Sequence, residues 1–136
     1  MAEILLQDPS VVIPVEASCL ATDAPFALVR VSGPSVGGVI QVETIDVTDP
    51  SKMPVAGMIL SKSSATNCVV LMSGIATLPG SPLVPGARYF AGASGTISPV
   101  PVPAMPRPFI TQFVGVAIDQ DRLLLQPSCD MVRIQT

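Results

Sequence analysis

The chain has 136 residues, of which 49% are hydrophobic and only 12% are charged, with a net charge of −3 and no histidine. This length fits one domain with its own core, while the charged share is about half that of an ordinary soluble domain. Because Pro or Gly interrupts every apolar run before about 18 residues, no membrane span is expected, and the few scattered basic residues argue against nucleic acid as a partner.

The chain begins with a predicted N-terminal arm over residues 1–8, followed by a single β domain over residues 9–136. The arm lacks the basic region and the long apolar stretch of a secretory signal. It does contain three consecutive large aliphatic residues, Ile4, Leu5 and Leu6. Aliphatic residues at an unanchored terminus are expected to dock on another surface, so we predict that these three contact a partner.

The spacing of 15 prolines and 10 glycines excludes long helices and divides the chain into short strands rich in Val, Ile and Leu. Pairs such as Gly33-Pro34, Gly37-Gly38 and Pro85-Gly86 predict turns between them. The pattern predicts an all-β fold, a single small β-barrel or β-sandwich with a proline-rich loop. The predicted strands are Val11–Val15, Phe26–Val31, Val39–Val47, Val55–Leu60, Cys68–Met72, Arg88–Ala91, Ile110–Ile118, Leu123–Gln126 and Met131–Gln135.

The predicted strands differ in how their apolar residues are arranged. Val39–Val47 alternates, which places Gln41 and Glu43 on a solvent-facing side. Val69–Met72 and Val114–Ile118 are apolar without alternation. Both faces of these two runs are therefore expected to be covered, either by the core or by another subunit.

Two segments resemble each other and each predicts a β-hairpin. In each, the first strand contains an internal glycine, Gly57 or Gly115, where a bulge or a close backbone approach is expected. The similarity is consistent with an internal duplication, and also with chance. The two predicted hairpins join Val55–Leu60 to Cys68–Leu71 and Val114–Ile118 to Leu123–Leu125.

A proline-rich strap covers residues 98–108 and cannot enter the interior of a sheet, because proline has no N–H to donate. It is either a recognition segment for a groove in a partner or a plain connector between two strands. The residues predicted to contact a partner here are Pro99, Pro101, Pro103, Pro106, Arg107 and Pro108.

The sequence offers little for catalysis. With no histidine, the commonest general base and metal ligand is absent, so we predict no catalytic residues, no metal and no cofactor. Two carboxylate pairs, Asp46 with Asp49 and Asp119 with Asp121, have the residue types that a glycosidase needs. Turn formation by the aspartate side chains accounts for these pairs better, and a carbohydrate-active or carbohydrate-binding domain stays as the alternative of another class.

The three cysteines, Cys19, Cys68 and Cys129, lie far apart in the sequence and form an odd set. This spacing argues against a disulfide framework and against a metal site. Each is flanked by apolar residues, so we predict buried thiols in a chain that folds in a reducing cytoplasm.

The order of landmarks between Pro54 and Pro127 resembles a β-module of tailed-phage virion proteins. The module occurs in capsid decoration or head-fibre proteins and in tail-fibre or baseplate subunits. The landmarks, in chain order, are Gly57, Ser73-Gly74-Ile75-Ala76, Leu83-Val84-Pro85-Gly86-Ala87-Arg88-Tyr89-Phe90, Gly92, Gly95-Thr96-Ile97-Ser98, the proline-rich strap and Phe113-Val114-Gly115-Val116-Ala117.

This resemblance implies a virion structural protein with no catalytic residues to carry over. The first expectation is a capsid cement protein, made in the cytoplasm of a bacterial host and bound to the capsid surface. Its partners would be the major capsid protein and copies of itself, as a trimer or dimer. The alternative within the same class is a tail-fibre or baseplate module.

Overall fold

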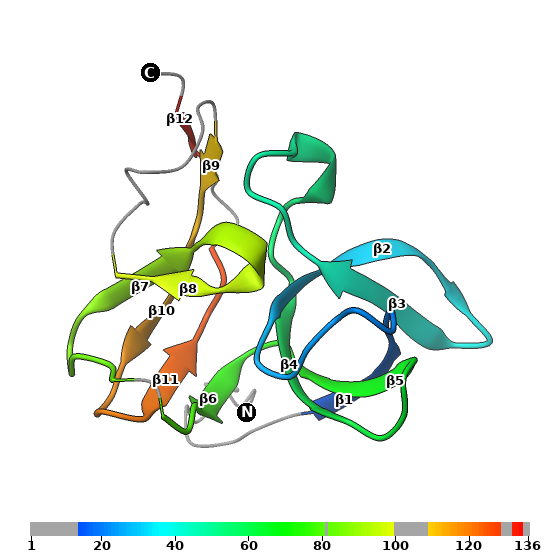
Figure 1. The fold of residues 1–136 in the computed structure, drawn as a ribbon, viewed down its shortest axis with the longest axis horizontal. Helices are drawn as coiled ribbons and strands as arrows, with labels where there is room; N and C mark the ends of the chain where they lie inside the picture. Colours follow the sequence, from blue (N-terminus) through cyan, green and yellow to red (C-terminus); the bar gives the residue numbers. More distant parts are fainter. Residues whose placement is uncertain (1–13, 81, 100–108, 129–131, 135–136) are drawn as a thin grey trace, which may run out of the picture.

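The computed structural model describes residues 14–80, 82–99, 109–128 and 132–134. In these residues the regular structure consists of β-strands and two short 3-10 helices, and five of the strands close into a barrel (Figure 1). This confirms the predicted all-β class and the barrel. In the described part of the chain, no helix is long and apolar enough to cross a membrane. The predicted arm, residues 1–8, lies outside the described residues.

The barrel has the strand order β1-β3-β2-β4-β5, and we refer to these five strands as the barrel unit. β1 pairs antiparallel with β5 and parallel with β3, and the parallel pairing closes the barrel. Its wall alternates as expected for a strand with one inner face, since Val42 on β3 is buried and its neighbours are only half-buried. The five strands are β1 (Pro14–Ser18), β2 (Leu28–Val36), β3 (Val39–Thr44), β4 (Gly57–Lys62) and β5 (Asn67–Leu71).

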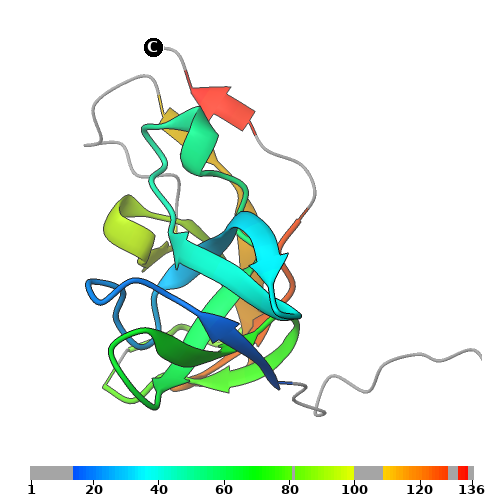
Figure 2. The same cartoon turned by 90° about the vertical axis from the view of Figure 1, so that its right-hand side faces the viewer.

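A second sheet has the order β6-β11-β10-β7-β8; it lies beside the barrel in Figure 1 and behind it in Figure 2. We refer to these five strands as the sheet unit. The predicted strand Arg88–Ala91 is confirmed as β7, whereas β6 and β8 were not predicted. The strands are β6 (Gly74–Thr77), β7 (Arg88–Ala91), β8 (Ile97–Ser98), β10 (Phe113–Ala117) and β11 (Arg122–Leu125).

The predicted strand Ile110–Ile118 is wrong as one element, because it is broken at Gln112. The residues before the break pair with the end of the chain, and the residues after it belong to the sheet unit. The remaining elements are β9 (Phe109–Thr111), which pairs with β12 (Val132–Ile134), and the 3-10 helices η1 (Pro50–Lys52) and η2 (Ala93–Gly95).

The turn predicted at Gly33-Pro34 is also wrong, because β2 continues through both residues to Val36. The register between β2 and β3 shifts on both sides of Gly33, and an irregular ladder tolerates a proline that has no N–H to donate. The chain instead reverses at Gly37-Gly38, where φ is +59° and +81°. Two adjacent positive φ angles match the hairpin turn that favours glycine at both positions.

The two units have the same connectivity. In the barrel unit the pairing runs β1 to β5, β5 to β4, β4 to β2 and β2 to β3. In the sheet unit it runs β6 to β11, β11 to β10, β10 to β7 and β7 to β8. This is the same path when β6, β7, β8, β10 and β11 are matched, in chain order, to β1, β2, β3, β4 and β5. Both predicted hairpins are confirmed as β4–β5 and β10–β11. The similarity predicted for two hairpins therefore extends to five strands.

Each unit has a close backbone approach at its internal glycine. A Cβ on Gly57 would lie 2.5 Å from the carbonyl oxygen of Leu71, and a Cβ on Gly115 would lie 2.4 Å from that of Leu124. In both hairpins a carbonyl oxygen of the second strand thus packs so close to the glycine that no Cβ fits between them. The predicted close approach is confirmed in both.

One hydrophobic core joins the units. It contains Leu28, Met58 and Leu71 of the barrel unit together with Val114 and Leu123 of the sheet unit, all of them buried. Full burial of a side chain of this size is worth about 1.5–3 kcal/mol, so the shared core holds the two units against each other. A separate cluster fills the inside of the barrel and consists of Ala17, Cys19, Val29, Val42, Ile59, Cys68 and Val70.

Candidate partner-contact surface

The two units carry equivalent turns immediately before β2 and β7. The sequences are Ala24-Pro25-Phe26-Ala27 and Val84-Pro85-Gly86-Ala87. The Phe26 N–H donates to the Ile59 carbonyl at 2.6 Å, and the Gly86 N–H donates to the Ala117 carbonyl at 2.8 Å. Proline at the second turn position followed by a left-handed residue is the pattern of a type II turn.

Phe26 occupies a backbone conformation that normally requires glycine. Its φ is +69°, while Gly86 at the equivalent position has φ +83°. A side chain in the left-handed region costs roughly 1–2 kcal/mol, because its Cβ crowds the backbone carbonyl. The barrel unit therefore holds a phenylalanine where the sheet unit has the less strained residue. Strain of this kind is concentrated at functional sites.

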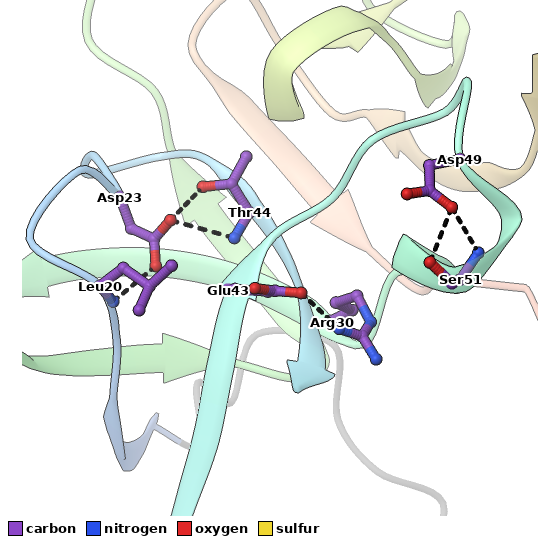
Figure 3. Close-up of polar contacts among 7 residues, drawn as sticks. All are labelled: Leu20, Asp23, Arg30, Glu43, Thr44, Asp49 and Ser51. Carbon is purple, nitrogen blue, oxygen red and sulfur yellow. Dashed lines mark hydrogen bonds and ion pairs between the residues drawn. The ribbon is translucent and has the colours of Figure 1, made fainter. Parts of the chain in front are cut away.

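The buried Asp23 carboxylate fixes the loop that presents Phe26 (Figure 3). It accepts hydrogen bonds from the Leu20 N–H at 2.8 Å, from the Thr44 N–H at 3.1 Å and from the Thr44 hydroxyl at 2.7 Å. The Lys62 ammonium adds a bond to the Asp23 carbonyl at 2.7 Å. These bonds tie the loop to β3 and β4, so the turn is held in place by the barrel.

Phe26 is 39% exposed and borders an apolar pocket of about 360 Å³ between the two units. None of the residues lining this pocket carries a charge. A partly exposed aromatic ring beside an uncharged pocket is a common feature of protein contact surfaces. The lining includes Ala24, Phe26 and Met58 of the barrel unit, and Leu78, Pro79 and Ile97 from the sheet-unit side.

A second apolar pocket, of about 330 Å³, continues the surface beyond Ile97, which lines both pockets. It is bordered by Val84, which is 61% exposed, and by Pro99. The Tyr89 hydroxyl accepts a hydrogen bond from the Val84 N–H at 3.0 Å and holds that turn in place. We call the surface formed by Phe26, Val84, Ile97 and Pro99 the seam surface.

Two contacts hold the units together at the seam. A Cβ on Gly95, whose φ is +78°, would lie 2.6 Å from the Thr44 side chain, so this residue must be glycine for η2 to approach the barrel. The buried Gln112 side chain accepts from the Val55 N–H at 2.8 Å and donates to the Ser128 carbonyl at 2.8 Å. The same glutamine that interrupts the predicted strand therefore connects β10 to the chain entering β4.

The structure places only one of the predicted contact residues. Pro99 is exposed and lies on the seam surface. Phe26 and Val84 were not predicted; the one signal for them was the parallel between Ala-Pro-Phe-Ala and Val-Pro-Gly-Ala. The other predicted contacts lie outside the described residues: Ile4, Leu5, Leu6, Pro101, Pro103, Pro106, Arg107 and Pro108.

Three of the four candidate aspartates form hydrogen bonds within their own turns, as predicted. Asp46 accepts from the Thr48 hydroxyl at 2.6 Å, and Asp49 from the Ser51 hydroxyl at 2.7 Å (Figure 3). These Ser51 bonds hold the pKa of Asp49 below its ordinary value. Each carboxylate thus stabilises its own loop by bonding the backbone or a hydroxyl two residues ahead.

Asp119, the third of these aspartates, fixes the β10–β11 turn through Arg122. Its carboxylate accepts from the Arg122 N–H at 3.0 Å and forms an ion pair with the guanidinium at 2.6 Å. These contacts lower the pKa of Asp119 to about 2, mainly through the side-chain hydrogen bond with Arg122. Within the described residues, no three His, Cys, Asp or Glu side chains form a group that could hold a metal ion.

Comparison with protein families, with curated proteins and with solved structures gave no match. The surface is therefore interpreted from its own residues. A strained, partly exposed phenylalanine and two uncharged pockets along a closely packed seam form a surface suited to apolar contact.

Proposed function

We propose that the chain is a non-catalytic structural protein of a virion, and that it works as a capsid cement or decoration protein. It would bind across subunits of the major capsid protein, as an oligomer on the capsid surface. The observation that carries the proposal is Phe26, a residue that strains its own turn and is 39% exposed beside an apolar pocket. A role in contacting a partner accounts for a phenylalanine at a position where glycine would be less strained.

The composition and the resemblance support the same role. Hydrophobic residues at 49% with charges at 12% leave a surface that a partner is expected to cover. Three of the four seam-surface residues, Val84, Ile97 and Pro99, belong to the landmarks that resemble the phage β-module, whereas Phe26 precedes them in the chain. Burial of the seam surface would stabilise a shell at about 25 cal/mol per Å² of apolar area, before the costs of ordering.

The test measures binding to shells assembled from a candidate major capsid protein. Phe26→Asn keeps a residue that tolerates positive φ but removes the ring, and should weaken co-sedimentation with the shells at least tenfold. Val36→Ser is the matched control, because Val36 is 67% exposed and lines neither pocket of the seam surface. Equal binding by Phe26→Asn and the control would contradict the assignment of the surface.

The resemblance also includes tail-fibre and baseplate modules, and we keep these as the alternative within the class. Electron microscopy of particles with and without the protein separates the two. A capsid cement protein alters the head or its resistance to rupture, whereas a tail module alters the tail.

A further inference from the structure

Cys19 and Cys68 are neighbours inside the barrel, although 48 residues lie between them in the sequence. In the pairing of β1 with β5, Ala17 lies opposite Cys68 and Ser18 opposite Asn67. The ladder continues past the end of β1, because the Cys19 N–H donates to the Thr66 carbonyl at 2.9 Å. Cys19 and Cys68 are therefore diagonal neighbours on the same face of the two paired strands.

Both thiols point into the barrel. Cys19 is 5% exposed and Cys68 is 3% exposed, and both belong to the cluster that fills the inside of the barrel. Neither forms a disulfide in this structure. The Cys68 thiol donates to the Ala17 carbonyl at 3.6 Å, a weak bond within the same strand pair. Burial, followed by hydrogen bonding with the Cys19 thiol, raises the pKa of Cys68 to about 12.

From this placement we infer that Cys19 and Cys68 are a redox-sensitive pair that forms an intramolecular disulfide, linking the residue that follows β1 to the neighbouring strand β5. The inference concerns the barrel itself and is independent of the proposed capsid role. The oxidant is a disulfide of a small thiol, for which oxidised glutathione is the probe.

The reaction proceeds by thiol–disulfide exchange. The thiolate of one cysteine attacks the glutathione disulfide, forming a mixed disulfide and releasing one glutathione thiolate. The second cysteine, as its thiolate, attacks the protein sulfur of the mixed disulfide and releases the other glutathione. Two protein thiols are oxidised, one glutathione disulfide is reduced to two thiols, and the two protons pass to the solvent and the departing thiolates. Because the buried Cys68 thiol is protonated at neutral pH, exchange is slow in the folded barrel and fast during folding.

The test refolds the Cys129→Ser variant from urea in a mixture of reduced and oxidised glutathione. We expect an intact mass lower by two hydrogen atoms, two fewer thiols, and a peptide map that joins Cys19 to Cys68. Because the bond closes a loop of about 50 residues, the oxidised form should melt about 5–10 °C higher than the reduced form, and dithiothreitol should reverse the difference.

Two variants distinguish this pair from other oxidation. Cys19→Ala and Cys68→Ala, each with Cys129 retained, should refold without an intramolecular disulfide. The inference is overturned if the Cys129→Ser protein keeps both thiols after refolding in the redox mixture, if a disulfide to Cys129 forms in the native chain instead, or if the Cys19–Cys68 bond lowers the melting temperature.

Discussion

The strain at Phe26 can be measured by exchanging alanine and glycine at the two equivalent turn positions. At an ordinary position, glycine is less stable than alanine by roughly 0.5–1 kcal/mol, because it loses more backbone entropy on folding. In the left-handed region, the Cβ of alanine instead costs roughly 1–2 kcal/mol. Since φ is +69° at Phe26 and +83° at Gly86, glycine should be more stabilising than alanine at both positions.

The expected magnitude follows from the difference between these two terms. Phe26→Ala and Phe26→Gly lose the same aromatic ring, so comparing them cancels the ring's packing. Phe26→Gly should then be more stable than Phe26→Ala by about 0.5–1 kcal/mol. Gly86→Ala should be less stable than the parent by a similar amount, because a Cβ there meets no atom within 4 Å and only the backbone conformation opposes it.

Urea unfolding followed by circular dichroism gives these differences directly, provided that the slope with urea is unchanged among the variants. If alanine were as stable as glycine at either position, the turn would not carry the proposed strain. If glycine were more stabilising than alanine at position 86 and not at position 26, the two turns would not be equivalent.

Three further changes test other parts of the account. Gly57→Ala and Gly115→Ala should each destabilise the chain by about 2–4 kcal/mol in urea unfolding, since the new Cβ would lie within 2.5 Å of a carbonyl oxygen; a loss below about 0.5 kcal/mol would contradict the close approach. Gln112→Leu should cost about 1–3 kcal/mol by leaving a buried N–H unpaired, and an unchanged midpoint would contradict the role at the seam. Asp119→Asn should lower the melting temperature at neutral pH. The pKa of Asp119 is about 2 in the folded chain and 3.8 ordinarily, so the ionised carboxylate stabilises the fold at pH values above 3.8, and this stabilisation is lost as the pH falls from about 4 to 2. The difference in melting temperature between the parent and Asp119→Asn should therefore shrink over that pH range. A difference that did not change with pH would contradict the ion pair with Arg122.

The sequence was sufficient to predict the fold class and both hairpins. Dense Pro and Gly exclude long helices whatever the tertiary structure, and the apolar runs on either side of short polar loops leave few pairings other than hairpins. The glycines at 57 and 115 were expected to allow a close approach, and both do. These are local features, decided by residues near one another in the chain.

The elements that sequence reasoning missed or misplaced depend on contacts between distant residues. Gln112 interrupts an otherwise continuous apolar run because its side chain bonds to Val55 and Ser128, which no local pattern reveals. Pro34 stays within β2 because the ladder is irregular there. β8 is only two residues long, too short to produce a periodic pattern.

The candidate surface could be predicted only in part. Pro99 was expected to contact a partner and lies on the seam surface, but Phe26 was assigned to the start of a strand. Phe26 has a positive φ because its turn is equivalent to the turn that contains Gly86, and this equivalence is visible only when the two units are compared in three dimensions. Phenylalanine itself gives no sign of a left-handed conformation, which it adopts rarely.

The central claim is that the seam surface makes this chain part of a larger assembly. Light scattering of the full chain, alone and mixed with a candidate shell protein, tests it most directly. The account predicts a solution mass above that of one 14.0 kDa chain, or a complex with the shell protein, and Phe26→Asn should reduce either one while Val36→Ser leaves it unchanged. A strictly monomeric chain that does not associate with the shell protein would contradict the claim.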